Sequence, residues 1–127
     1  MKPLALEWVV KSEAADFATA SREMRARKSP NFDAVCFHSQ QCAEKRLKAL
    51  LVEEAIPFSK THDLIRLLDL LIPIYRPLEL LRPHLAELTD FAVEFQYPGE
   101  SADKQIAQIA LGSCKLIRQE ISLILPF

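Results

Sequence analysis

Helix-favouring residues fill this chain almost without interruption, and this feature restricts the fold more than any other. Only two glycines occur among the 127 residues, Gly99 and Gly112. There is no Asn-Gly or Asp-Gly hairpin signal, and no segment has the β-branched enrichment of strands. Leu, Ala, Glu, Lys and Arg dominate, and the prolines fall mostly in clusters that divide the chain. The sequence therefore predicts an all-α fold.

The first two predicted helices are separated by Ser29-Pro30-Asn31, which stops one helix and starts the next. Before this break, steps of four and three predict one core-facing stripe, formed by Leu6, Val10, Glu13, Phe17, Ala20 and Met24. The second helix is expected from about Phe32 to Glu54. Its core side should hold Cys36, Ala43, Leu47 and Leu50.

Three further helices are expected in the second half of the chain. The first follows residues 59–63, which are rich in N-capping types, and its apolar residues up to Ile72 predict deep burial. The next carries Leu85, Leu88, Ala92 and Phe95 on one face. The last should run from about Ala102 to Leu125 and use Ile106, Ile109, Ser113, Leu116, Ile117, Ile121 and Ile124.

Long helices joined by short polar breaks pack as antiparallel neighbours. We therefore expect an up-and-down four-helix bundle with an additional short helix. A chain of this length has the size of one domain, so residues 1–127 should form a single bundle. A bundle this rich in leucine leaves apolar surface for a second copy, which predicts a homodimer.

Composition narrows the classes of function. A formal net charge of -1 argues against a protein that coats DNA or RNA. The apolar run before Lys11 is too short for a signal peptide, and no apolar run is long enough to span a membrane. Three cysteines without a CxxC pair suggest buried thiols in a reducing compartment. We expect a cytoplasmic location, no metal site and no cofactor.

Polar residues on the second helix form the first candidate site. His38, Gln41, Lys45 and Lys48 follow one another at steps of three, four and three, so they share one stripe, which Glu44 borders. One interpretation is a solvated polar face. The other is an anion-binding strip, in which the lysines supply point charges and Gln41 supplies hydrogen bonds.

Thr61, His62 and Asp63 form the second candidate site, at the predicted start of a helix. Thr61 or Asp63 can cap free backbone amides, which is a structural role. The helix N-terminus can also hold a phosphate, with His62 as a proton donor that titrates near neutral pH. No nucleophile elbow, Walker loop, dinucleotide fingerprint or HExxH motif accompanies these residues.

The segment from Cys36 to Leu51, CFHSQQCAEKRLKALL, resembles the second-helix signature of HEPN domains. Thr61-His62-Asp63-Leu64 and Tyr97-Pro98-Gly99 resemble two further landmarks of that family in the right order. The resemblance spans the chain from the first helix to the last. It implies a four- to five-helix bundle, commonly dimeric. In prokaryotes such proteins often work beside a minimal nucleotidyltransferase in a toxin–antitoxin-like module.

Many members of this family are metal-independent ribonucleases with an Arg-x4-6-His motif. The resemblance assigns the histidine to acid/base chemistry near the 2′-hydroxyl and the arginine to the phosphate. Here no arginine occupies the required windows, which are residues 31–33 before His38, 55–57 before His62 and 77–79 before His84. The residue before Tyr97, often arginine in this subgroup, is Gln96.

Two hypotheses follow. The favoured one is a non-catalytic module that binds a nucleotide or phosphate ligand, or a minimal nucleotidyltransferase partner. Its ligand-binding residues would be His38, Gln41, Lys45, Lys48, Thr61, His62, Asp63 and Tyr97. The alternative is a metal-independent ribonuclease in which His38 or His62 pairs in space with a distant arginine or lysine.

Overall fold

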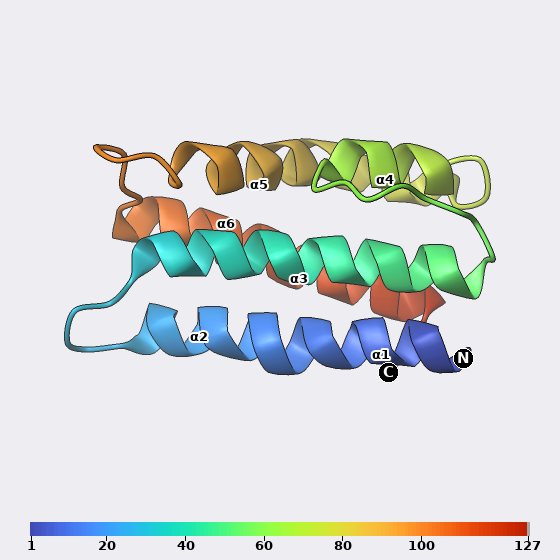
Figure 1. Cartoon of the computed structure of the whole chain (residues 1–127), viewed down its shortest axis with the longest axis horizontal. Coiled ribbons are helices and arrows are strands. Elements are labelled where there is room, and N and C mark those ends of the chain that lie inside the picture. Colours follow the sequence, from blue (N-terminus) through green and yellow to red (C-terminus); the bar gives the residue numbers. More distant parts are fainter. Residues whose placement is uncertain (127) are drawn as a thin grey trace.

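The computed structural model describes residues 1–126, which form helices and no strand. Four long helical units alternate in direction (Figure 1). They are the continuous unit α1 (Pro3–Lys11), π-helical η1 (Ser12–Phe17) and α2 (Ala18–Arg25), then α3 (Phe32–Glu53), α5 (Arg82–Glu94) and α6 (Lys104–Ile124). The short α4 (Leu64–Leu71) and the 3-10 helix η2 (Arg76–Leu81) connect α3 to α5. The predicted up-and-down bundle with one short extra helix is confirmed.

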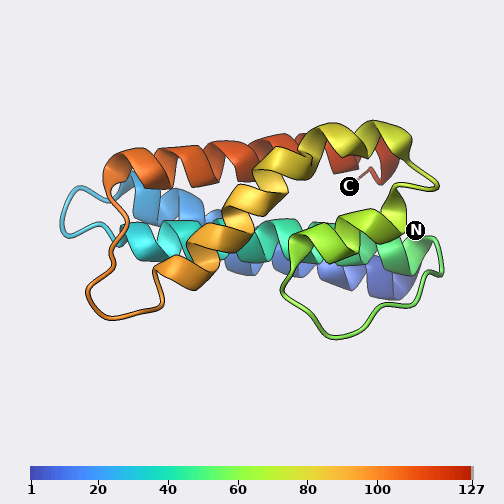
Figure 2. The same ribbon diagram turned by 90° about the horizontal axis from the view of Figure 1, so that it is seen from above.

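Helix α3 is the centre of the bundle and packs against α1, α2, α4, α5 and α6. It lies beside the first helical unit and in front of α6, while α5 crosses the bundle obliquely (Figures 1 and 2). Its residues Leu47, Leu50 and Leu51 are fully buried. Burial of one such side chain contributes about 1.5–3 kcal/mol, so these leucines hold α3 firmly against its neighbours.

Side-chain caps fix where three helices begin. Asn31 accepts a hydrogen bond from the backbone nitrogen of Ala34 at 2.9 Å, and Asp103 caps α6 in the same way at 2.8 Å. Asp63 accepts from the backbone nitrogen of Ile65 at 3.0 Å. Each cap satisfies an amide that the helix leaves unpaired. The predicted break at Asn31 and the capping role of Asp63 are both confirmed.

The predicted core stripe of the first helix is wrong in its first half. Leu6 and Val10 are 42% and 44% exposed. The buried positions in α1 and η1 lie one residue earlier, at Ala5, Val9, Ser12 and Asp16. Two causes explain the difference. Small side chains let α1 approach α3 closely, and the π-helical segment holds one residue more per turn than a 3.6-residue pattern assumes.

Two predictions of burial in the second half are also wrong. Helix α4 is deeply buried on one face only, because Leu64, Leu67, Leu68 and Leu71 are buried while Leu70 is exposed. The helix lies on the bundle with its other face in solvent. Because leucines occur on both faces, the sequence does not show which face is buried. Ile109 of α6 is likewise exposed. Within residues 1–126, no helix combines the length and the apolar character that a membrane crossing requires.

Candidate functional site

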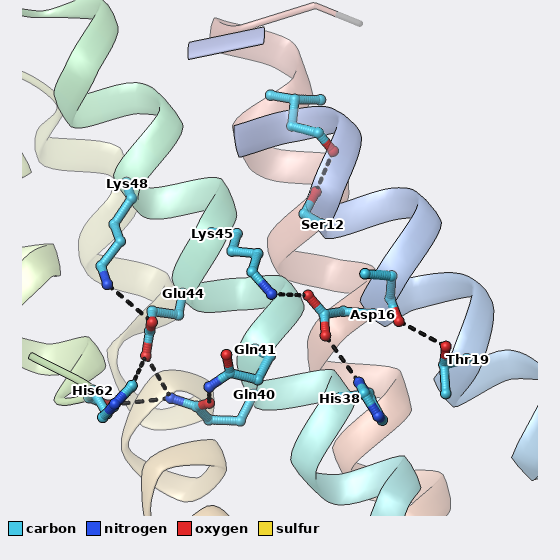
Figure 3. A network of polar contacts seen from close by, with 12 residues as sticks. Ser12, Asp16, Thr19, His38, Gln40, Gln41, Glu44, Lys45, Lys48 and His62 are labelled. Carbon is cyan, nitrogen blue, oxygen red and sulfur yellow. Dashed lines mark hydrogen bonds and ion pairs between the residues drawn. The ribbon is translucent and has the colours of Figure 1, made fainter. Parts of the chain in front are cut away.

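A buried carboxylate from the first helical unit meets the predicted polar stripe of α3. Asp16 lies in η1 and is only 2% exposed. Its Oδ1 lies 2.8 Å from Nδ1 of His38, and its Oδ2 accepts a hydrogen bond from Nζ of Lys45 (Figure 3). A charge buried to this degree requires such partners, since desolvation of a lone carboxylate is strongly unfavourable.

A second buried carboxylate, Glu44, lies on α3 itself and is 3% exposed. Its oxygens accept hydrogen bonds from Nζ of Lys48 at 3.0 Å and from Nε2 of Gln40 at 3.3 Å. Nδ1 of His62, in the loop before α4, lies 2.9 Å from the same carboxylate. Figure 3 shows these groups converging from the helix and the loop. Glu44 therefore joins the two candidate sites that the sequence presented separately.

The two carboxylates change the electrostatics of the stripe. Lys45 pairs with Asp16 and Lys48 pairs with Glu44, so each ammonium charge is balanced by a carboxylate. With neutral imidazoles, the stripe has no formal net charge. An anion at this surface would depend on hydrogen bonds and on charges beyond the stripe itself. The spacing correctly placed the stripe on one face, but sequence reasoning missed its partner Asp16.

Both histidines present the same nitrogen to a carboxylate. In His38 and in His62, Nδ1 faces Asp16 and Glu44 respectively. A carboxylate that accepts a hydrogen bond from Nδ1 favours the tautomer with its proton there. Nε2 is then the acceptor nitrogen. The side chain of His62 is 81% exposed, so its Nε2 is open to a ligand.

A cleft of about 500 Å³ lies between α3, the loop before α4, and α5. Its apolar lining is formed by Phe37, Ala92 and Val93. Its polar lining is formed by Gln40, Gln41, His62, Asp63, Thr89 and Gln96. The volume falls in the range of about 300–1,000 Å³ that small-molecule sites occupy. The mixture of a few convergent polar groups with apolar walls is typical of such sites.

A second, smaller hollow of about 310 Å³ lies beside the cleft. It is lined by Lys48, Lys60, Thr61 and His62. Lys60 is exposed and forms no ion pair with another of the residues described in the structure. The hollow therefore has a basic lining, in contrast to the cleft, whose charged group is Asp63.

The predicted ligand-binding residues fall into three groups: those that line the cleft, those that line the hollow, and those that line neither space. Gln41, His62 and Asp63 line the cleft, and Lys48, Thr61 and His62 line the hollow. His38 and Lys45 meet at Asp16 and line neither space. Tyr97, in the turn after α5, is 64% exposed and also lines neither.

Sequence reasoning missed the contributions of Gln40, Thr89 and Gln96. Gln40 lies on the α3 flank that faces the loop, and its Nε2 donates to the carbonyl oxygen of His62 at 3.1 Å. Thr89 and Gln96 come from α5 and the turn after it, and only the chain fold brings them to α3. For Asp16 the sequence held no usable signal either, because its place among the buried Val9 and Ala20 appears only in the folded chain.

A third ionic cluster lies away from both spaces. Glu13 accepts hydrogen bonds from Arg46 and from Arg118, the latter at 2.6 Å. Burial acts to raise the pKa of Glu13, but the two guanidinium groups together hold it below its ordinary value. The guanidinium of Arg118 also lies 3.5 Å from the ring centroid of Phe17. Glu13, the one charged residue of the predicted stripe, thus links the first helical unit to α3 and α6.

Within residues 1–126, no cluster of histidine, cysteine or acidic side chains has the grouping of a metal site. Comparison with curated proteins gave no match, and comparison with solved structures gave none either. The model of the HEPN domain family matches residues 6–124, which is nearly the whole chain. HEPN domains are associated with nucleotide binding and with ribonuclease and toxin roles. By this match and by its helical architecture, the chain belongs to the HEPN family.

Proposed function

We propose that this HEPN domain is a non-catalytic module that binds a nucleotide across the two adjoining spaces. The phosphates would occupy the basic hollow, and the remainder of the nucleotide would occupy the cleft. The observation that carries this proposal is the position of His62, which lines both spaces. A ligand with a charged end and an apolar, hydrogen-bonding end fits two such spaces better than either fragment alone.

The phosphate end rests on four groups. Lys60 supplies a charge with no carboxylate partner among the described residues, and Lys48 supplies a second charge that Glu44 shares. The hydroxyl of Thr61 donates a hydrogen bond, and Nε2 of His62 donates one when the imidazole ring carries a proton on both nitrogens. Thr61 Oγ1 already accepts from the backbone nitrogen of Asp63 at 3.1 Å, which leaves its hydroxyl proton for a ligand.

The absence of the linear Arg-x4-6-His motif supports binding without catalysis. We further propose that the domain acts as a cytoplasmic homodimer beside a minimal nucleotidyltransferase partner, in a toxin–antitoxin-like module. This part of the proposal rests on the dimers and the nucleotidyltransferase partners that are common in the HEPN family. Co-purification of a tagged chain with the product of a neighbouring gene tests the partnership, and sedimentation of the purified protein tests the dimer.

Isothermal titration of ATP into the purified protein tests nucleotide binding. Lys60→Ala should weaken binding about fivefold, since one charge-assisted contact at an exposed site contributes about 1 kcal/mol. His62→Ala should weaken it as much or more, because His62 borders both spaces. Lys28→Ala, in the exposed loop between α2 and α3, is the matched control and should bind as wild type. If ATP shows no binding, or if all variants bind equally, the assigned site is wrong.

A ribonuclease of unusual type is the second candidate, and one observation favours it. Each histidine shares a carboxylate with a lysine, in the groups Lys45–Asp16–His38 and Lys48–Glu44–His62. Such a group could use Nε2 as the base toward a 2′-hydroxyl, with an ammonium near the phosphate.

RNA cleavage in EDTA separates the two candidates. Cleavage that disappears in His38→Ala or His62→Ala would establish a non-linear active site and refute the binding-only proposal. RNA that stays intact with the wild-type protein, at a concentration that saturates the nucleotide site, would refute the ribonuclease.

A further inference from the structure

We propose that the cleft binds the base of the nucleotide and prefers bases that carry an exocyclic amino group. Adenine, guanine and cytosine have such a group, whereas uracil does not. This inference deepens the proposed function and rests on it. It follows from a chain of hydrogen bonds between side chains, which begins at the carboxylate of Glu44 and ends at the side-chain amide of Gln41.

The first link fixes the amide of Gln40. Its Nε2 lies 3.3 Å from Oε1 of Glu44 and 3.1 Å from the carbonyl oxygen of His62. A carboxylate and a backbone carbonyl only accept hydrogen bonds, so this end of the amide must be the nitrogen. Both of its N–H groups are thereby used. The oxygen of Gln40 must point the other way, toward Gln41.

The second link fixes the amide of Gln41. Oε1 of Gln40 accepts a hydrogen bond from Nε2 of Gln41 at 2.7 Å. An amide turned the other way would set two oxygens against each other, so this orientation is also determined. Figure 3 shows the nitrogen of Gln41 against the oxygen of Gln40, with its own oxygen turned away. No donor among residues 1–126 satisfies that oxygen, and Gln41 lines the cleft.

At Gln41 the cleft therefore offers an acceptor, and no lysine or arginine is among the described residues that line it. Asp63 adds a carboxylate, of which Oδ1 caps the backbone nitrogen of Ile65 and Oδ2 has no hydrogen-bond partner in the described part of the chain. A phosphate would be repelled by Asp63, which agrees with its placement in the neighbouring hollow. A group with N–H donors and no charge is complementary to the Gln41 oxygen and to Asp63, whereas the amide of Gln96, which also lines the cleft, can pair with a donor or an acceptor. The exocyclic amine of a nucleobase is such a group.

The shape of the lining suits a flat ring. Phe37 is partly exposed and stands edge-on to His38, with ring centroids 5.1 Å apart and planes at 81°. Its ring, with Ala92 and Val93, gives the cleft an apolar wall. Aromatic side chains stack on bases without regard to their identity, so the wall supplies affinity and the Gln41 oxygen supplies selectivity.

The test compares two nucleotides that differ at one position of the base. CTP carries an amino group where UTP carries a carbonyl oxygen, and the ring, ribose and phosphates are shared. Titration calorimetry should show that the wild-type protein binds CTP about tenfold more tightly, because UTP loses one bond and sets two acceptors together. ATP and ITP repeat the comparison on a purine and should show the same preference.

Gln41→Leu keeps the size of the side chain and removes the acceptor, so the preference should fall to within about twofold. Gln41→Ala is a second variant with the same expectation, and circular dichroism checks that both remain helical. Gln108→Leu, on the exposed face of α6, is the matched control and should keep the full preference.

Two results would overturn the inference while nucleotide binding itself stands. One is equal affinity of the wild-type protein for CTP and UTP, with both weakened by Lys60→Ala. The other is a preference for the amino base that survives both Gln41 substitutions. A complete lack of binding by all four nucleotides would instead refute the proposed function. The two failures are therefore distinguishable in one set of titrations.

Discussion

Three side chains depend on the carboxylate of Glu44, so replacing it with glutamine tests the site most directly. Glu44→Gln keeps the size of the side chain but removes its charge and one acceptor oxygen. Lys48 then loses its ion-pair partner while its side chain remains 9% exposed. The one oxygen that remains can serve Lys48, or else His62 and Gln40, but not both sides, so at least one of these contacts is lost. The expected result is a large loss of stability.

The size of that loss follows from the geometry. Removing one partner of a buried ion pair destabilises a protein by about 3–5 kcal/mol. The lower end applies here, because the Lys48 ammonium keeps cation–π contacts with Trp8 and Phe58, whose ring centroids lie 5.4 and 5.9 Å away. His62 is exposed and can turn to water. An unfolding entropy of about 2.1 cal/mol/K per residue makes a loss of about 3 kcal/mol a fall of roughly 11 °C in Tm.

Urea unfolding followed by circular dichroism measures this free energy. The exposed Glu87→Gln is the control and should change it by less than about 0.5 kcal/mol. Glu44→Gln combined with Lys48→Met removes the stranded charge and should recover at least half of the loss. If Glu44→Gln stays within about 0.5 kcal/mol of wild type, Glu44 does not organise the site and the amide orientation inferred from it fails.

Other predictions follow from three shifted groups. The hydrogen bond to Glu54 raises the pKa of Tyr75 to about 12, and Glu54→Gln should return it toward about 10 in an absorbance titration at alkaline pH. Burial, with Asp33 and Asp103 nearby, raises the pKa of the Cys36 thiol to about 12. All three cysteines are buried, so the native protein at pH 8 should resist a thiol-specific disulfide reagent that labels all three after denaturation. Because the pKa of Glu13 is lowered on folding, its contribution to stability is present above its ordinary value of 4.5 and is lost as the pH falls through the folded value. Glu13→Gln should flatten the acid side of the stability profile, and an unchanged slope would contradict the link that Glu13 makes.

The helices were predictable because each carries a local signal. The cap at Asn31, the buried face around Leu47 and the cap at Asp63 are short-range features that a sequence displays directly. The phase of the first helix was not predictable from a 3.6-residue period. Leu6 and Val10 are larger than Ala5 and are apolar, so the pattern predicted that they face the core. The bundle instead buries the residues one position earlier.

The candidate site was predictable only in part. The spacing placed His38, Gln41, Lys45 and Lys48 on one face, as the structure has them. Their partners could not be read, since Asp16 lies in another helical unit and reaches α3 through irregular geometry. The link from Glu44 to His62 depends on the path of a loop, which has no periodicity to follow. The cleft needs α5 as well, and no local pattern relates α5 to the stripe.

The π-helical segment Ser12–Phe17 has a consequence for insertions and deletions in this chain. The segment absorbs its extra residue locally, so the α-helical turns on either side still bury Val9 and Ala20 against the bundle. Deleting the exposed Ala14 or Ala15 would let the segment become a regular α-helix, with its flanking turns still in phase. Asp16 would shift relative to His38 and Lys45, because it lies inside the segment. Deleting one residue can therefore change the hydrogen-bond partners of Asp16 while the helices keep their packing against one another.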